Sequence, residues 1–247
     1  MFEYVPPCNL EGLQLYLSQP SKSSLTNFQK HLPRYFVATM LTKPIKVEIQ
    51  EPLEVVLVMF HKVRTAHLFK TPMEIFTDNQ MDLADMYPNL VRVFDEQFRA
   101  DISLGKKIKA VNHLLVQISN QRTYNDNLVY YLVDTIYQKN GHVKVKDLKD
   151  SACTSYKTLE TKFKRNLGMT PKMYIDIVRA NRTLHCLKNL DSYHGQQLMQ
   201  STGFYDESHL IKCFKKYFDA TPKQMYKKLN QPIWFKEDEF ASQILNT

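Results

Sequence analysis

Four cysteines and eight histidines are the side chains of this 247-residue chain most suited to metal binding. The cysteines are widely separated and form no C-x-x-C pair: Cys8, Cys153, Cys186 and Cys213. This spacing is typical of reduced thiols in a cytoplasmic protein rather than of a disulfide framework or a zinc site. His61 and His67 stand six residues apart, which does not place two ring nitrogens as a ligand pair on one helical or strand face. We therefore predict no metal and no other cofactor.

Asp206, Ser208 and His209 are the residue types of a hydrolytic triad. All three fall within one turn of an expected helix, so they cannot form the hydrogen-bonded relay that a triad requires. No other group of residues suggests catalysis, and we predict that the protein is not an enzyme.

The positive charge is concentrated in one part of the chain. Residues 125–230 contain 18 Lys and Arg against 10 Asp and Glu, while residues 1–124 contain 14 against 12 and residues 231–247 contain 1 against 3. A local basic excess favours encounter with polyanions, although a solvated surface explains the charge alone equally well. No apolar run approaches the roughly 20 residues that span a bilayer, and no secretory signal opens the chain.

The hydrophobic pattern indicates two kinds of structure. Residues 34–61 are the only clear β region, with short Val- and Ile-rich runs broken by prolines. Helical spacing follows over 88–100 and 103–119, and the polar stretch 119–127 indicates a domain boundary. Beyond it we expect helices only, at these positions: 126–139, 145–152, 155–166, 171–189, 195–201, 206–217 and 222–229.

A repeat with a shift of 51 residues carries the functional prediction. Residues 163–172 read FKRNLGMTPK and residues 214–223 read FKKYFDATPK. A leucine stands four residues before each phenylalanine, so Leu159/Phe163 and Leu210/Phe214 would each anchor one helix. Each copy therefore predicts a short helix, a tight turn, a second helix with a polar outer face, and a Thr-Pro pair that begins another helix.

Such a helix pair suits DNA recognition, because an apolar side holds the helix while a polar side reads base edges. A duplicated helical hairpin without a ligand is the alternative, but two copies are few for a solenoid core. The basic excess in the same segment favours DNA.

Residues 128–228 resemble the DNA-binding domain of the AraC/XylS family of bacterial transcription regulators. The first unit matches the family pattern at Ser155, Leu159, Phe163, Lys164, Gly168, Thr170 and Pro171, and Arg179 matches the arginine that opens the long connecting helix. The second unit matches at Gly203, Phe204, Asp206, Ser208, Leu210, Lys212, Phe214, Lys215, Phe218, Thr221 and Pro222. This chain departs from the family pattern at four positions: Lys149 and Met199 replace small alanines, Cys153 replaces a turn glycine, and Thr161 replaces a frequent DNA-contacting arginine. These differences suggest a weaker contribution from the first unit.

The resemblance implies an α+β protein with a small mixed α/β N-terminal domain and an all-α C-terminal domain, in which a long helix joins two helix-turn-helix units. It implies a regulatory or dimerisation domain over 1–121, a double helix-turn-helix domain over 122–230 and a C-terminal tail over 231–247. The implied function is a cytoplasmic, sequence-specific transcription regulator, an activator, that reads two successive major grooves of double-stranded DNA. RNA polymerase and a small-molecule effector are implied partners, and the protein would be a monomer or a homodimer.

The resemblance also implies which side chains face DNA. In the first unit these are Tyr156, Lys157, Glu160, Thr161 and Lys164, and in the second Glu207, Ser208, His209, Ile211, Lys212, Lys215 and Lys216. Lys164, Lys215 and Lys216 suit phosphate better than bases, and His209 is equally well explained as a surface side chain. For the N-terminal domain, an effector pocket and a dimerisation or packing module both stay open. A helical protein-interaction module that has lost DNA binding is the alternative function, suggested by Thr161 and the acidic Glu160 and Glu207.

Overall fold

The computed structural model describes residues 2–5, 11–16, 24–25, 30–31, 33–38, 40–48, 55–60, 63–98, 101–120 and 126–229. Contacts within the chain divide it into two compact units, Met1–Val178 and Arg179–Thr247. Cys8, His61, the predicted domain boundary near 121–122 and the predicted tail over 231–247 lie outside the described residues.

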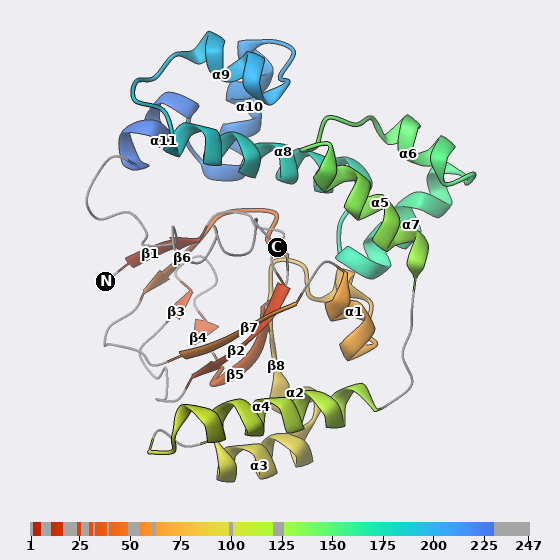
Figure 1. Cartoon of the computed structure of the whole chain (residues 1–247), viewed down its shortest axis with the longest axis vertical. Coiled ribbons are helices and arrows are strands. Elements are labelled where there is room, and N and C mark those ends of the chain that lie inside the picture. The colour runs from red at the N-terminus through yellow and green to blue at the C-terminus, as the bar shows by residue number, and fades with distance from the viewer. Residues whose placement is uncertain are drawn as a thin grey trace. The chain divides into compact units, whose positions relative to one another are not determined.

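The N-terminal part contains two antiparallel sheets of four strands each (Figure 1). The first sheet has the order β1 (Phe2–Val5), β6 (Ile45–Glu48), β3 (Ser24–Leu25) and β4 (Lys30–His31). The second has the order β7 (Val55–Phe60), β2 (Glu11–Tyr16), β5 (Tyr35–Ala38) and β8 (Gln80–Asp82). The region 34–61 supplies β5, β6 and β7.

The prediction that residues 34–61 form the only clear β region is wrong, because five strands lie outside it. β3 and β4 have two residues each and are too short to show an alternating pattern. β2 does alternate, with Leu13 and Leu15 buried, but it becomes a strand through its long-range pairing with β5 and β7. Strand formation of this kind depends on partners that a local pattern does not contain.

Five helical elements follow β7 in the chain, with β8 between the second and the third: α1 (Arg64–Phe69), η1 (Met73–Ile75), α2 (Leu83–Met86), α3 (Pro88–Gln97) and α4 (Leu104–Ser119). Figure 1 shows α3 and α4 side by side on one face of the second sheet, where Phe94, Leu114 and Ile118 join its core. The predicted helices over 88–100 and 103–119 are therefore confirmed. Leu104 and Ile108, near the beginning of α4, are exposed.

The rest of the described chain is helical, as predicted, and each helix begins and ends within about one residue of its predicted bounds. The helices are α5 (Asn127–Gln138), α6 (Val145–Ser151), α7 (Tyr156–Leu167), α8 (Pro171–Lys188), α9 (Gly195–Thr202), α10 (Glu207–Phe218) and α11 (Pro222–Leu229). Arg179 lies in the middle of α8 rather than at its beginning. The fold class is thus confirmed: an α+β protein whose all-α part contains two helix-turn-helix units joined by the long helix α8. No helix among the described residues is long and apolar enough to cross a membrane.

Candidate nucleic-acid interface

The first helix-turn-helix unit consists of α6 and α7. Leu159 and Phe163 on the inner side of α7 are fully buried, which confirms them as its anchors. The ring of Phe163 lies 6.1 Å from the ring of Tyr174 in α8. The Ser155 hydroxyl accepts a hydrogen bond of 3.1 Å from the backbone N–H of Thr158, so α7 begins with a side-chain cap.

The outer side of α7 carries the predicted contact residues. Tyr156, Lys157, Glu160 and Thr161 are exposed, and Lys164 is half-buried. The helix thus brings these five side chains to one surface, where they are accessible to a ligand. Their contact with DNA stays a prediction.

An ion pair within this surface is a feature that the sequence analysis did not include. Lys164 Nζ lies 2.7 Å from Glu160 Oε1, and this hydrogen bond raises the pKa of the Lys164 ammonium above its ordinary value. The four-residue spacing on one helix was the available signal. Glu160 therefore partly neutralises a lysine that we expect to meet phosphate.

The turn before α7 holds Cys153 in a left-handed backbone conformation with φ of 47°. This conformation favours glycine, which agrees with the expectation that Cys153 stands in place of a turn glycine. Lys149, the replacement for a small alanine in α6, pairs with Asp150 and places its ammonium 5.5 Å from the ring centroid of Tyr156. The lysine thus lies on the surface of the unit and contacts the first residue of α7.

The second unit, α9 and α10, repeats this construction. Leu210 and Phe214 are fully buried, which confirms them as anchors, and Gly203 at the turn has φ of 63°. Asp206 Oδ1 accepts a hydrogen bond of 2.7 Å from the backbone N–H of His209 and so caps α10. Asp206 stands 51 residues after Ser155, the cap of α7, so the two caps occupy equivalent positions in the repeat.

The outer side of α10 presents most of its predicted contact residues to solvent. Five are exposed and two are half-buried: Glu207, Ser208, Lys212, Lys215 and Lys216 in the first group, His209 and Ile211 in the second. The His209 ring lies 5.2 Å from the ring of Phe204, whose other neighbour is the Arg179 guanidinium at 5.7 Å. His209 thus has a packing role within the unit, and this contact supports the interpretation as a surface side chain over a base contact.

Glu207 lies close to the loop before α9. A Cβ added at Gly195 would be 3.3 Å from the Tyr193 hydroxyl and 3.6 Å from Glu207 Oε1. Burial, and then the Glu207 carboxylate, raise the pKa of Tyr193. The Tyr226 hydroxyl of α11 donates to the backbone oxygen of Asp191 at 2.9 Å, so α11 also holds this loop.

Both Thr-Pro pairs begin helices, as predicted. The Thr170 hydroxyl accepts from the backbone N–H of Met173 and the Thr221 hydroxyl from that of Gln224, each at 3.2 Å. The recognition helices α7 and α10 end at equivalent residues with left-handed backbone, Gly168 with φ of 71° and Asp219 with φ of 50°. Residues 51 positions apart therefore match in sequence and also have the same structural roles as helix caps and helix ends.

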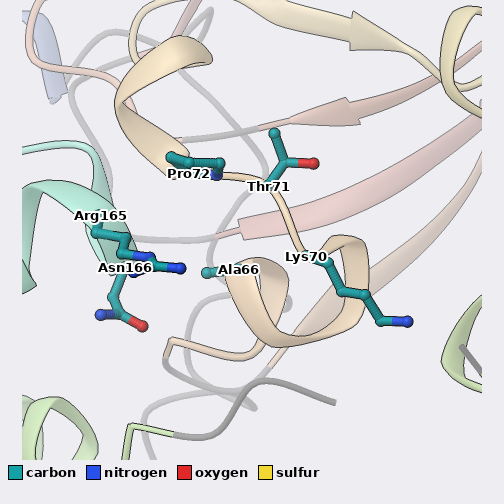
Figure 2. A pocket seen from close by; sticks show the side chains of 6 residues that line it. All are labelled: Ala66, Lys70, Thr71, Pro72, Arg165 and Asn166. Carbon is teal, nitrogen blue, oxygen red and sulfur yellow. The ribbon is translucent and has the colours of Figure 1, made fainter. Parts of the chain in front are cut away.

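The first unit also contacts the N-terminal part of the chain. Thr77 Oγ1 donates to the backbone oxygen of Gly168 at 2.8 Å, and Lys162 Nζ pairs with the buried Asp126 Oδ2 at 2.7 Å. A small recess lies between α1 and α7, with a volume of about 30 Å³ (Figure 2). Six residues line it: Ala66, Lys70, Thr71, Pro72, Arg165 and Asn166.

Comparison with known proteins places the described site in a known domain family. Residues 148–228 match the family model described as a helix-turn-helix domain. The chain is similar to the HTH-type transcriptional activator RhaS of Escherichia fergusonii, with 25% identity over 114 residues. The match covers 46% of this chain and spans 40% of the length of RhaS.

Among solved structures, the chain is similar to ToxT from Vibrio cholerae. One of these structures is 11% identical with a TM-score of 0.49, and the match covers 94% of this chain and 98% of the ToxT chain. Another, described as unsaturated fatty acid bound, is 9% identical with a TM-score of 0.48 and covers 93% of this chain and 94% of its own. Likeness of this size says nothing about what this chain binds.

Proposed function

Because the helix-turn-helix domain of this chain belongs to the AraC/XylS family of transcription regulators, we propose that the protein activates transcription by reading two successive major grooves with α7 and α10. The broader function, a DNA-binding transcription regulator, follows from the family. The observation that carries the finer proposal is the equivalent construction of the two units. Each has a capped helix, a buried Leu-Phe anchor and an accessible polar outer side.

The length of the connecting helix agrees with reading two grooves. At a rise of 1.5 Å per residue, the 18 residues of α8 extend over about 27 Å. Successive major grooves on one side of a duplex are about 34 Å apart. We propose that α8 supplies much of this separation when both recognition helices bind one duplex.

The exposed side chains divide into base-reading and phosphate-binding roles. Lys157 and Lys212 can donate to guanine, and Glu160 can accept from the amino group of cytosine. Ile211 can contact a thymine methyl group. Lys164, Lys215 and Lys216 follow in the last turns of their helices and suit phosphate.

The decisive experiment compares Lys157→Ala and Lys212→Ala on a cognate duplex, selected from random sequences, and on random duplex. If both lysines read bases, each substitution should cost about 1–3 kcal/mol on the cognate site and less on random DNA. Lys109→Ala, an exposed lysine of α4, is the matched control and should change neither affinity.

Salt titration of the wild-type protein tests DNA binding itself. The logarithm of affinity should fall linearly with the logarithm of salt concentration, with a slope set by the number of phosphates contacted. A flat salt dependence would favour the alternative, a protein-interaction module. Equal losses on both duplexes would assign the two lysines to phosphate, and unchanged affinity in both variants would refute the proposed roles of α7 and α10.

Activation requires contact with RNA polymerase, and a reporter that rises only when the selected site is present would distinguish an activator from a repressor. Exposed Leu104, Ile108 and Val116 on α4 favour a packing or homodimerisation role. Sedimentation equilibrium would test homodimerisation, because a strictly monomeric protein contradicts a dimer.

A further inference from the structure

Tyr205 is the most exposed of the large apolar side chains that the structure describes, with 99% of its surface accessible. It lies in the turn between α9 and α10, directly before the capping residue Asp206. A tyrosine ring offers a large apolar area with a hydroxyl at its end, a combination enriched at binding surfaces. The sequence analysis did not include Tyr205 among the contact residues.

The backbone around Tyr205 is fixed on both sides. Gly203 ends α9 with φ of 63°, and Asp206 is extended, with φ of −152° and ψ of 166°, while its carboxylate caps α10. Phe204 is buried between Arg179 and His209. Phe204 is buried and Tyr205, the next residue, faces solvent, so this turn directs the two side chains into different surroundings.

The two units differ at this position. Thr154 is the equivalent of Tyr205 under the shift of 51 residues, and it is half-buried. The first unit instead has Tyr156, one residue after its cap, with 54% of its surface exposed. Each unit therefore presents one exposed tyrosine next to the N-cap of its recognition helix, on opposite sides of the cap.

We propose that Tyr205 is a further DNA-contacting residue, whose hydroxyl donates a hydrogen bond to a backbone phosphate at the edge of the groove that α10 enters. The inference rests on the proposed function of α10. A residue before the recognition helix lies outside the stretch that reads base edges, and most protein–DNA hydrogen bonds of this kind go to phosphate or sugar. The ring packs on the neighbouring deoxyribose, which makes the contact independent of base sequence.

A comparison of Tyr205→Phe and Tyr205→Ala separates the hydroxyl from the ring. Removing a hydrogen bond to a charged phosphate should weaken binding about 10-fold in Tyr205→Phe, and Tyr205→Ala should lose more. The losses should be equal on cognate and random duplex. The slope of log affinity against log salt concentration should stay unchanged in both Tyr205 variants, because tyrosine is neutral. Lys212→Ala, in contrast, removes a positive charge from the DNA-facing surface.

Tyr131→Ala is the matched control, since Tyr131 is 56% exposed on α5, and it should bind like the wild type. A second measurement follows the side chain directly: tetranitromethane should nitrate Tyr205 rapidly in the free protein and slowly when duplex DNA is bound. Thermal unfolding of both Tyr205 variants should match the wild type, because the Tyr205 side chain is 99% exposed.

Three results would overturn the inference. Wild-type affinity in both Tyr205 variants would show that the side chain does not meet DNA. A loss in Tyr205→Ala alone would exclude the hydroxyl contact, and a loss on the cognate duplex alone would assign the residue to base reading. If the wild-type protein and Lys212→Ala both fail to bind any duplex, the proposed function itself fails, and the outcome is distinguishable from the other three.

Discussion

At the residue level, Cys153 is a weak point of the first helix-turn-helix unit. Its side chain is exposed and its φ is 47°, a conformation that costs an L-residue about 1–2 kcal/mol. Glycine adopts this backbone without the clash but loses more conformational freedom on folding, by about 0.5–1 kcal/mol. We expect Cys153→Gly to raise the free energy of unfolding by roughly 0.5–1 kcal/mol, measured by urea denaturation.

Cys153→Ala is the control for this substitution, because it removes the thiol and its weak contact with the Asp150 carbonyl while keeping the Cβ atom. It should leave stability within about 0.5 kcal/mol of the wild type. Equal stabilisation by both variants would show that the thiol, and not the left-handed backbone, is unfavourable.

Sequence reasoning identified the residues of the repeat whose roles depend on local chemistry. The anchors Leu159 and Leu210 and the caps Thr170 and Thr221 required only helical spacing and hydrogen-bonding capacity. Tyr205 was not predicted as a contact residue, because its exposure is a property of the folded turn and not of the residue type.

At the level of elements, the recognition helices depend on their N-caps. Asp206→Ala should lower the free energy of unfolding by about 1 kcal/mol, because the N–H of His209 loses its acceptor. Asp206→Asn keeps an acceptor and removes a negative charge near the expected DNA surface. We expect it to change stability by only a few tenths of a kcal/mol and to bind duplex DNA at least as tightly as the wild type.

Ser155→Ala tests the equivalent cap of α7 and should cost a similar amount. Urea denaturation measures the stabilities and fluorescence anisotropy of labelled duplex the affinities. Weaker DNA binding by Asp206→Asn than by Asp206→Ala would contradict the expectation that Asp206 stabilises α10 as a cap while its negative charge disfavours DNA binding.

The helices from α5 to α11 were predictable to within about one residue and most strands were not, for a physical reason. α7 and α10 carry their determinants in one contiguous segment: cap, apolar spacing and a terminal residue with left-handed backbone. The strands β1 and β3 instead pair with β6, whose paired residues lie 22 to 46 positions further along the chain, so the sequence of each strand alone contains little information about the pairing.

At the level of the whole molecule, the described contacts tie the N-terminal part to the first unit through α5. Asp126 caps α5 and pairs with Lys162 on α7, while its own backbone N–H donates to His67 Nε2 in α1 at 3.4 Å. The Thr77 hydroxyl adds a bond to the end of α7 at Gly168. The sequence pattern predicts α5 and α7 but not their contacts with α1, because such contacts depend on how distant segments pack.

His67 makes this junction sensitive to pH. Burial, followed by the Arg64 guanidinium, lowers the pKa of its imidazole below 6.5, although Asp126 acts in the opposite direction. In the unfolded chain the same imidazole takes up its proton near pH 6.5, so below that pH the unfolded state binds more protons than the folded state. The free energy of unfolding contributed by neutral His67 is therefore complete above pH 6.5 and is lost as the pH falls through the folded-state pKa.

The substitution His67→Gln tests this, because the glutamine side-chain oxygen can still accept from the Asp126 N–H but does not titrate. Between pH 7.5 and about 5 the variant should lose less stability than the wild type, as measured by thermal unfolding at matched ionic strength. His113→Gln, at an exposed histidine of α4, should keep the wild-type pH dependence. If the His67 variant destabilises with falling pH as steeply as the wild type, His67 is not the group that makes the junction acid-sensitive.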